Sequence, residues 1–191
     1  MKCDIVLAGV GGQGVLSLAA AIAAAAMEEG LHVKQAEVHG MSQRGGAVTA
    51  SLRLADREIA SDLIPAGKAA MILSMEPLES LRYLAFLAPE GTLITSANPV
   101  RNITDYPNLE DLLRRIAALP HAIVVDAEKL AREAGSARAT NMVIVGAAMH
   151  LLPLRPEAVE ASVSRMFARK GEDVVAINLR ALRAGRQAAS A

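Results

Sequence analysis

The fold of this chain is decided near its N-terminus, where residues 3–14 read CDIVLAGVGGQG. The apolar residues 3–8 predict a short buried strand, and the glycine run that follows predicts a tight turn. Residues 13–29 are rich in alanine and predict a helix that ends at Gly30. A strand, a glycine turn and a helix make the first part of a βαβ unit, which is typical of α/β proteins.

Strand and helix patterns alternate along the rest of the chain. After a turn near Asp56, the alternating strand from Ala47 is expected to return as a hairpin through residues 58–60. The predicted fold class is a three-layer α/β domain over residues 1–191, with a mainly parallel sheet, a Rossmann-like N-terminal βαβ unit and an added β-hairpin. Strands are expected at 3–8, 32–38, 47–54, 70–75, 91–96 and 122–126, and helices at 13–29, from 77, from 108, and at 140–152, 156–168 and 173–185.

The composition excludes several classes of function. Among 191 residues, 20 Lys and Arg balance 20 Asp and Glu, and only 2% are aromatic, so the chain offers neither a basic field nor a stacking platform to nucleic acid. The longest apolar runs fall short of the roughly 18 residues that cross a bilayer, so no membrane partner is expected. The single cysteine, Cys3, excludes an internal disulfide and is typical of the reducing cytoplasm.

The glycine turn is the first candidate site. Gly9, Gly11 and Gly14 follow the spacing G-x-G-x-x-G between a strand and a helix, so free N–H groups of the helix can face a pyrophosphate. Glu37 lies 23 residues after Gly14, where a carboxylate would bind a ribose hydroxyl in a dinucleotide site. In the alternative interpretation, the glycines only let an alanine-rich helix pack on the sheet. Spacing alone leaves both interpretations open.

A polar loop after the second predicted strand is the second candidate site. Its glycines allow backbone N–H groups to join a guanidinium in holding a carboxylate or a phosphate, and a solvated loop without such a role is the alternative. Arg44 is the residue expected to contact an anion, with the other polar side chains as hydrogen-bonding groups. The candidates from the two motifs are Gly9, Gly11, Gly12, Gln13, Gly14, Glu37, His39, Ser42, Gln43, Arg44, Gly45 and Gly46.

Polar residues beside apolar runs are weaker candidates. Glu76 follows a strand, and we expect it either to enter a crevice or to cap the next helix. Asn141 and Asn178 lie near apolar helical surfaces, and Asn141 is kept as a candidate for binding a partner or an anion. His150 lies among apolar residues and is expected to be a core histidine, so no metal site is predicted.

The two N-terminal motifs together resemble the shared signature of the gamma-type subunits of 2-oxoacid:ferredoxin oxidoreductases. The resemblance continues through EPLE at 76–79, NMVIVG at 141–146 and AINLR at 176–180, and it covers nearly the whole chain. Within this family the chain is most similar to the beta subunits of indolepyruvate ferredoxin oxidoreductases. Gamma subunits of the pyruvate, 2-oxoglutarate and branched-chain enzymes are the alternatives.

The resemblance implies an enzyme that converts an aryl pyruvate and coenzyme A to an acyl-CoA, carbon dioxide and reduced ferredoxin, with thiamine diphosphate, Mg²⁺ and iron–sulfur clusters as cofactors. One cysteine cannot hold such a cluster, and no Gly-Asp-Gly motif is present to place Mg²⁺ and diphosphate. We therefore expect the cofactors on a large catalytic subunit, ferredoxin as an indirect partner, and no catalytic residue on this chain. Whether the chain forms a homodimer in isolation is left open.

We expect the two motifs to meet at the carboxyl ends of the first two strands and to face the active site of the partner. There they would bind its substrate or the phosphates of coenzyme A, or complete the interface. A free-standing dinucleotide-binding protein and a purely structural docking module are the competing hypotheses.

Overall fold

The computed structural model describes residues 1–40 and 45–190, and of His39 it describes the backbone only. Within these residues, six strands form one sheet and seven α-helices surround it. The strands are β1 (Lys2–Val10), β2 (His32–His39), β3 (Ala47–Ala55), β4 (Ala69–Ser74), β5 (Leu87–Ser96) and β6 (Ala122–Val125). The helices are α1 (Val15–Glu28), α2 (Pro77–Arg82), α3 (Leu109–Ala117), α4 (Ala127–Glu133), α5 (Thr140–Ala148), α6 (Pro156–Phe167) and α7 (Glu172–Ala189).

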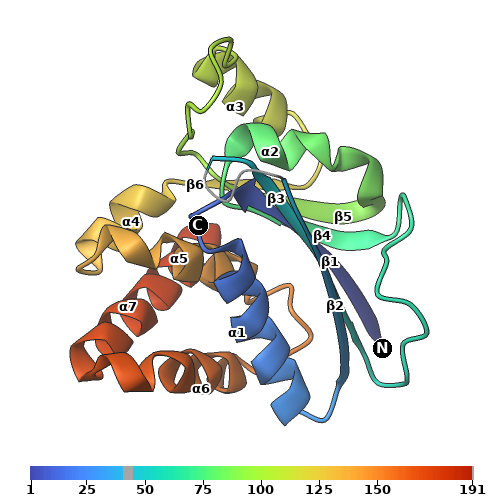
Figure 1. Ribbon diagram of the computed structural model, residues 1–191, viewed down its shortest axis with the longest axis vertical. Helices are drawn as coiled ribbons and strands as arrows, with labels where there is room; N and C mark the ends of the chain where they lie inside the picture. Colours follow the sequence, from blue (N-terminus) through green and yellow to red (C-terminus); the bar gives the residue numbers. More distant parts are fainter. Residues whose placement is uncertain (41–44, 191) are drawn as a thin grey trace.

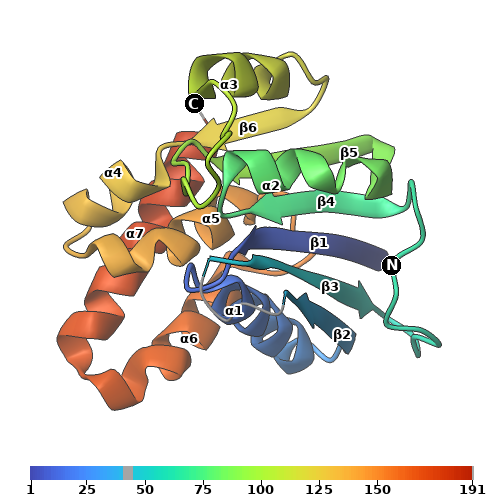
Figure 2. The same ribbon diagram turned by 45° about the horizontal axis from the view of Figure 1, so that its top comes forward.

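The sheet has the strand order β2-β3-β1-β4-β5-β6 (Figure 2). Strands β1, β4, β5 and β6 pair in parallel, whereas β3 is antiparallel to both β1 and β2. The predicted α/β fold with a mostly parallel sheet is confirmed. Helix α1 connects β1 to β2, but β3 lies between these two strands, so the N-terminal βαβ unit encloses an antiparallel strand.

Helices cover both faces of the sheet and produce three layers (Figure 1). On one face, Ile5 and Leu7 of β1 pack against α1 and α4–α7. On the other face, Val6 of β1 and Ile72 of β4 pack against α2 and α3. One strand serves two cores because successive side chains in a strand point to opposite faces.

The hairpin of this fold differs from the one predicted. Strands β2 and β3 form it, on either side of residues 40–46, and residues 58–60 are not in a strand. The alternating pattern that begins at Ala47 was sufficient to predict β3, but the preceding strand rather than the following segment supplies its partner.

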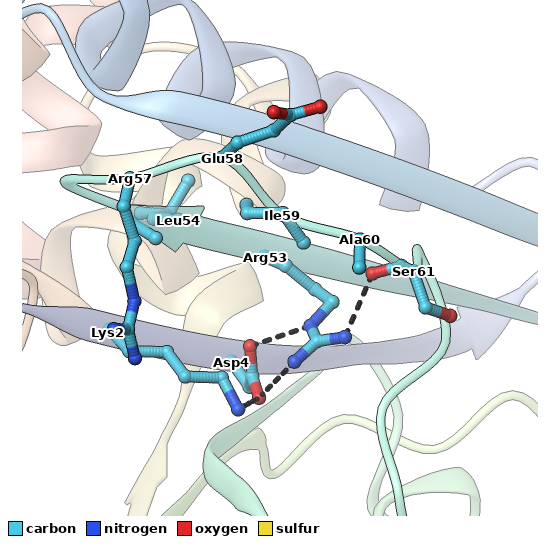
Figure 3. Close-up of a pocket in the computed structure, with 10 residues that line it drawn as sticks. Lys2, Asp4, Arg53, Leu54, Arg57, Glu58, Ile59, Ala60 and Ser61 are labelled. Carbon is cyan, nitrogen blue, oxygen red and sulfur yellow. Dashed lines mark hydrogen bonds and ion pairs between the residues drawn. The ribbon is translucent and has the colours of Figure 1, made fainter.

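Arg53 of β3 anchors the segment that comes directly after residues 58–60. Its guanidinium donates to both carboxylate oxygens of Asp4, at 2.9 and 3.1 Å, and to the carbonyl oxygens of Ser61 and Leu63, at 2.8 and 2.9 Å. Lys2 approaches the same carboxylate at 2.8 Å (Figure 3). The pocket around this buried pair is therefore held together by its own hydrogen bonds, and we interpret it as structural.

Helices α5 and α7 pack with their backbones in contact. A Cβ on Gly146 of α5 would lie 1.9 Å from the carbonyl oxygen of Leu182, and a Cβ on Gly185 of α7 would lie 1.9 Å from the carbonyl oxygen of Val143. Only glycine permits such an approach at both crossing positions. α7 presents an apolar side to this contact. This side does not make α7 a membrane-spanning helix, because no helix in the described part of the chain is long and apolar enough to span a membrane.

Candidate functional site

A crevice between β1 and β4 is the place where this topology favours ligand binding. The chain leaves β1 into α1 on one face of the sheet and leaves β4 into α2 on the other face. Parallel neighbours whose helices depart to opposite faces open a crevice at their carboxyl ends. The glycine turn follows β1 at this position, and residues 74–76 follow β4.

Backbone conformation and close packing both require the glycines of the turn. Gly12 has a φ of 102°, and Gly14, the N-cap of α1, has a φ of 82°. Both values lie in the left-handed region that favours glycine. Gly9 has no room for a side chain, because a Cβ there would lie 2.8 Å from Cγ2 of Val15. The fold itself thus accounts for these three glycines, whichever ligand the turn meets.

Gln13 ties the turn to the end of β4. Its Oε1 accepts a hydrogen bond from the N–H of Val10 at 2.7 Å, and its Nε2 donates to the carbonyl oxygen of Met75 at 3.0 Å. The N–H of Gln13 also donates to the carbonyl oxygen of Val10, at 3.1 Å. The amide group is engaged within the fold, so Gln13 positions the turn beside the crevice.

The two sequence motifs lie side by side at this edge of the sheet. Gly11 donates to the carbonyl oxygen of Gly46 at 2.8 Å, and Gly45 donates to the carbonyl oxygen of Gly11 at 3.3 Å. Asn102, from the segment after β5, donates to the carbonyl oxygen of Gly45. The expected meeting of the motifs is thus seen at these glycines. The candidates Ser42, Gln43 and Arg44 lie outside the described residues, as does the side chain of His39.

Glu37 does not take the position of a Rossmann carboxylate. It is exposed on β2, opposite Ala50 of β3, so β3 separates it from β1 and the glycine turn. Two strand spacings amount to about 10 Å. In a dinucleotide-binding fold, the carboxylate lies at the end of the strand that is adjacent to the one preceding the glycine turn. The spacing between Glu37 and Gly14 in the sequence therefore does not correspond to a Rossmann-type ribose site.

Asn141 joins the site from behind the turn. It is buried at the start of α5, and a Cβ on Gly14 would lie 2.9 Å from its Nδ2. Its Oδ1 accepts a hydrogen bond from the N–H of Met142 at 3.0 Å. The structure thus brings Asn141 into contact with the glycine turn, although the two are far apart in the sequence.

Glu76 caps α2 and also anchors the segment after β5. Its Oε2 accepts a hydrogen bond from Glu79 N at 2.7 Å, and its Oε1 accepts from the hydroxyl of Tyr106. Of the two roles predicted for Glu76, capping is confirmed. Burial, with the hydrogen bond and charge of Glu76, raises the pKa of Tyr106 well above its usual range, so this hydroxyl remains a donor. Tyr106 and Asn102 were not predicted, because their stretch has no periodicity.

A hollow of about 310 Å³ lies beside the turn, and Val10, Gly12, Leu16 and Val48 are among the residues that line it. Its walls combine apolar side chains with glycine backbone, and the start of α1 adds N–H groups that have no acceptor within the helix. None of the described residues that line it carries a titratable side chain. Such a surface can hold the anionic end of a ligand, but it offers no group for proton transfer.

The residues of this chain do not fit an iron–sulfur cluster. Cys3 is the single cysteine, and it is buried in β1. A cluster requires about four thiolates. Among the described residues, no group of three or more His, Cys, Asp and Glu side chains is placed to hold a metal ion. We therefore derive no redox step from this chain.

The thiol of Cys3 is expected to be inert in the folded chain. Burial, and to a lesser extent the charge of Asp4, raises the pKa of Cys3 from 9.0 to about 11. Since only the thiolate reacts, labelling by a thiol reagent at pH 8 should be at least about 100-fold slower in the native chain than in the chain unfolded in urea. Equal labelling rates in the two states would contradict this prediction.

Comparison with known proteins identifies the family. The model for "Pyruvate ferredoxin/flavodoxin oxidoreductase" matches residues 4–188. The chain belongs to this family. "Indolepyruvate oxidoreductase subunit IorB" of Pyrococcus horikoshii is 39% identical over 97% of this chain and 95% of its own length. The protein of the same name from Archaeoglobus fulgidus is 37% identical over 97% of this chain and 94% of its own length. The resemblance found in the motifs is confirmed.

A solved structure shares the fold of this chain. It is the 2-oxoglutarate:ferredoxin oxidoreductase from Magnetococcus marinus with 2-oxoglutarate, coenzyme A and succinyl-CoA bound, and it aligns with a TM-score of 0.78 at 22% identity. The alignment covers 99% of this chain and 31% of that chain. The fold of this chain is therefore also found as part of a much longer chain.

Proposed function

We propose that this chain is the small subunit of an indolepyruvate:ferredoxin oxidoreductase. The whole chain acts as one domain in the cytoplasm and supports the coenzyme A-dependent oxidative decarboxylation of aryl pyruvates. The observation that carries the proposal is the match, over nearly the full chain, to two proteins named as indolepyruvate oxidoreductase subunits.

The redox cofactors are assigned to a large partner subunit. The only thiol of this chain is buried, and the hollow beside the glycine turn offers no titratable side chain among its described residues. Thiamine diphosphate, Mg²⁺ and iron–sulfur clusters thus belong to the partner, and ferredoxin meets this chain only indirectly. The alignment with 31% of one longer oxidoreductase chain supports a domain that works beside others.

The glycine turn and the loop beside it face the active site of the partner. The turn lies at the crevice between β1 and β4, and the backbone bonds between Gly11, Gly45 and Gly46 hold the two motifs together. The N–H groups at the start of α1 suit an anion such as a phosphate of coenzyme A or a substrate carboxylate. Arg44, from the same loop, supplies the positive charge for this contact.

Substrate preference tests the assignment to indolepyruvate. The chain, co-expressed with its large subunit, should show a kcat/KM for indolepyruvate at least about tenfold above the values for pyruvate, 2-oxoglutarate and a branched-chain oxoacid. The readout is reduction of ferredoxin in the presence of coenzyme A. A higher kcat/KM for one of the other oxoacids would reassign the chain to that branch of the family.

Replacing Arg44 with alanine tests the role of the loop. We expect the complex to assemble as before and its turnover to fall about tenfold or more, because a charge-assisted hydrogen bond to an anion contributes about 1.5–3 kcal/mol. Arg57→Ala is the matched control, since Arg57 is an exposed arginine beyond β3, at the other end of the sheet. Unchanged turnover would remove the anion-binding role, and loss of assembly would support a docking role instead.

A further inference from the structure

A second pocket lies between α1, α5 and α7, on the face of the sheet that α1 covers. Its volume is about 350 Å³, which is within the range of small-molecule sites. Among its lining residues are Arg138, Lys170, Asn141, Asn178, Phe167 and Ser17. It is separate from the hollow beside the glycine turn, with which it shares no lining residue.

Two buried asparagines each present one unpaired amide atom to this pocket. The Oδ1 of Asn141 accepts from the N–H of Met142 at 3.0 Å, and the Nδ2 of Asn178 donates to the carbonyl oxygen of Val174 at 2.8 Å. These bonds fix the orientation of both amides and leave Nδ2 of Asn141 and Oδ1 of Asn178 without a partner among the described residues.

Both unpaired atoms remain open to the pocket. Asn141 is 7% exposed and Asn178 is 5% exposed. In the described part of the chain, Oε2 of Glu79 is the one side-chain oxygen or nitrogen that is both fully buried and without a hydrogen-bond partner. Nδ2 of Asn141 and Oδ1 of Asn178 are therefore not fully buried. These free atoms keep some exposed surface, and both residues line this pocket. Polar groups that are this deeply buried are normally paired, so they point to a ligand with both an acceptor and a donor.

The charge of the pocket indicates an anion as the acceptor. Arg138 and Lys170 line it, no aspartate or glutamate does so among the described residues, and neither cation forms an ion pair there. The ammonium of Lys170 lies 5.3 Å from the centre of the Phe167 ring, which holds it near the pocket. Two cations and the amide of Asn141 match the several acceptor oxygens of a phosphate group.

We propose that this pocket binds a small phosphate ester that carries hydroxyl groups, such as a sugar phosphate. The phosphate lies between Arg138, Lys170 and Nδ2 of Asn141, and a hydroxyl of the ligand donates to Oδ1 of Asn178. The site goes beyond the proposed function and does not depend on it. Asn141 also contacts Gly14 of the turn, but the other residues of the pocket belong neither to the glycine turn nor to the loop that contains Arg44.

Titration of the full chain with ribose 5-phosphate, followed by NMR, tests the site. We expect saturable shifts of the side-chain amide of Asn178 and of the backbone amides of Lys170 and Val174, with a Kd of about 1 mM or below. Ribose should cause no shifts, and inorganic phosphate should bind more weakly, because it lacks the hydroxyl donor. Equal affinity for inorganic phosphate would contradict the assignment of a phosphate ester.

Matched variants complete the test. Arg138→Ala and Lys170→Ala should each weaken binding about tenfold or more, whereas Arg169→Ala, which removes a neighbouring cation that does not line the pocket, should leave the Kd unchanged. No saturable shift up to about 10 mM would overturn the proposal. So would shifts confined to the amides of Gly11–Gly14, or an unchanged Kd in both pocket variants.

Discussion

Replacing Gly146 with alanine is expected to destabilise the chain by about 3 kcal/mol or more. The new Cβ would lie 1.9 Å from the carbonyl oxygen of Leu182, whereas comfortable contact requires about 3.5 Å. The clash is with backbone, so no side-chain rotation relieves it and the two helices must move apart. Gly185→Ala should behave alike, because its Cβ would meet the carbonyl oxygen of Val143 at the same distance.

The direction of the change in the free energy of unfolding shows whether α5 and α7 cross this closely. In a helix without such a contact, a glycine-to-alanine change stabilises by about 1 kcal/mol. Chemical denaturation of Gly146→Ala and Gly185→Ala therefore separates the two cases. Gln187→Ala, on an exposed position of α7, is the control and should change the free energy of unfolding by less than about 0.5 kcal/mol. Stabilisation of either glycine variant would mean that the helices do not cross this closely.

Replacing Arg53 with methionine is expected to cost about 3–5 kcal/mol of stability. The change leaves the carboxylate of Asp4, which is 2% exposed, without its bidentate partner. It also removes the donor to the carbonyl oxygens of Ser61 and Leu63. Lys2 remains beside Asp4, but its side chain is about half exposed and cannot replace a buried guanidinium. Urea denaturation gives the free energy directly.

A second variant separates the buried charge from the other effects of the Arg53 substitution. Adding Asp4→Leu to Arg53→Met removes the unpaired carboxylate, so most of the lost stability should return. Arg57→Met is the control, because Arg57 lines the same pocket from an exposed position and should change stability by less than about 0.5 kcal/mol. A full loss of stability in the Arg57 variant, or none in the Arg53 variant, would contradict the role given to the buried pair.

Local sequence patterns predicted most elements of the fold but not their arrangement. The apolar run at 70–75 corresponds to β4 (Ala69–Ser74), and Pro77 begins α2 as expected. Helix α4 (Ala127–Glu133) was missed, because seven residues give too few turns for periodicity to be visible. The insertion of β3 between β1 and β2 depends on long-range pairing, which no short window of sequence contains.

The candidate site was predicted only in part, because some of its contacts also depend on long-range pairing. Glycine spacing located the turn, and the expected meeting of the two motifs is seen at Gly11, Gly45 and Gly46. The antiparallel pairing of β3 with β1, which sets Ala47 opposite Val10, brings them together. The sequence spacing placed Glu37 beside the glycine turn, because that interpretation assumed that the first two strands of the chain are adjacent in the sheet. It also missed Asn102, which contacts the site only through the folding of a long loop.

Ferredoxin reduction by the separated and the recombined subunits tests the central claim most directly. With indolepyruvate and coenzyme A present, we expect no turnover by this chain alone and full turnover only when it is combined with its large subunit. The folded state of the isolated chain, checked by its thermal transition, excludes misfolding as the cause. Turnover by this chain alone, or undiminished turnover by the large subunit without it, would contradict the claim.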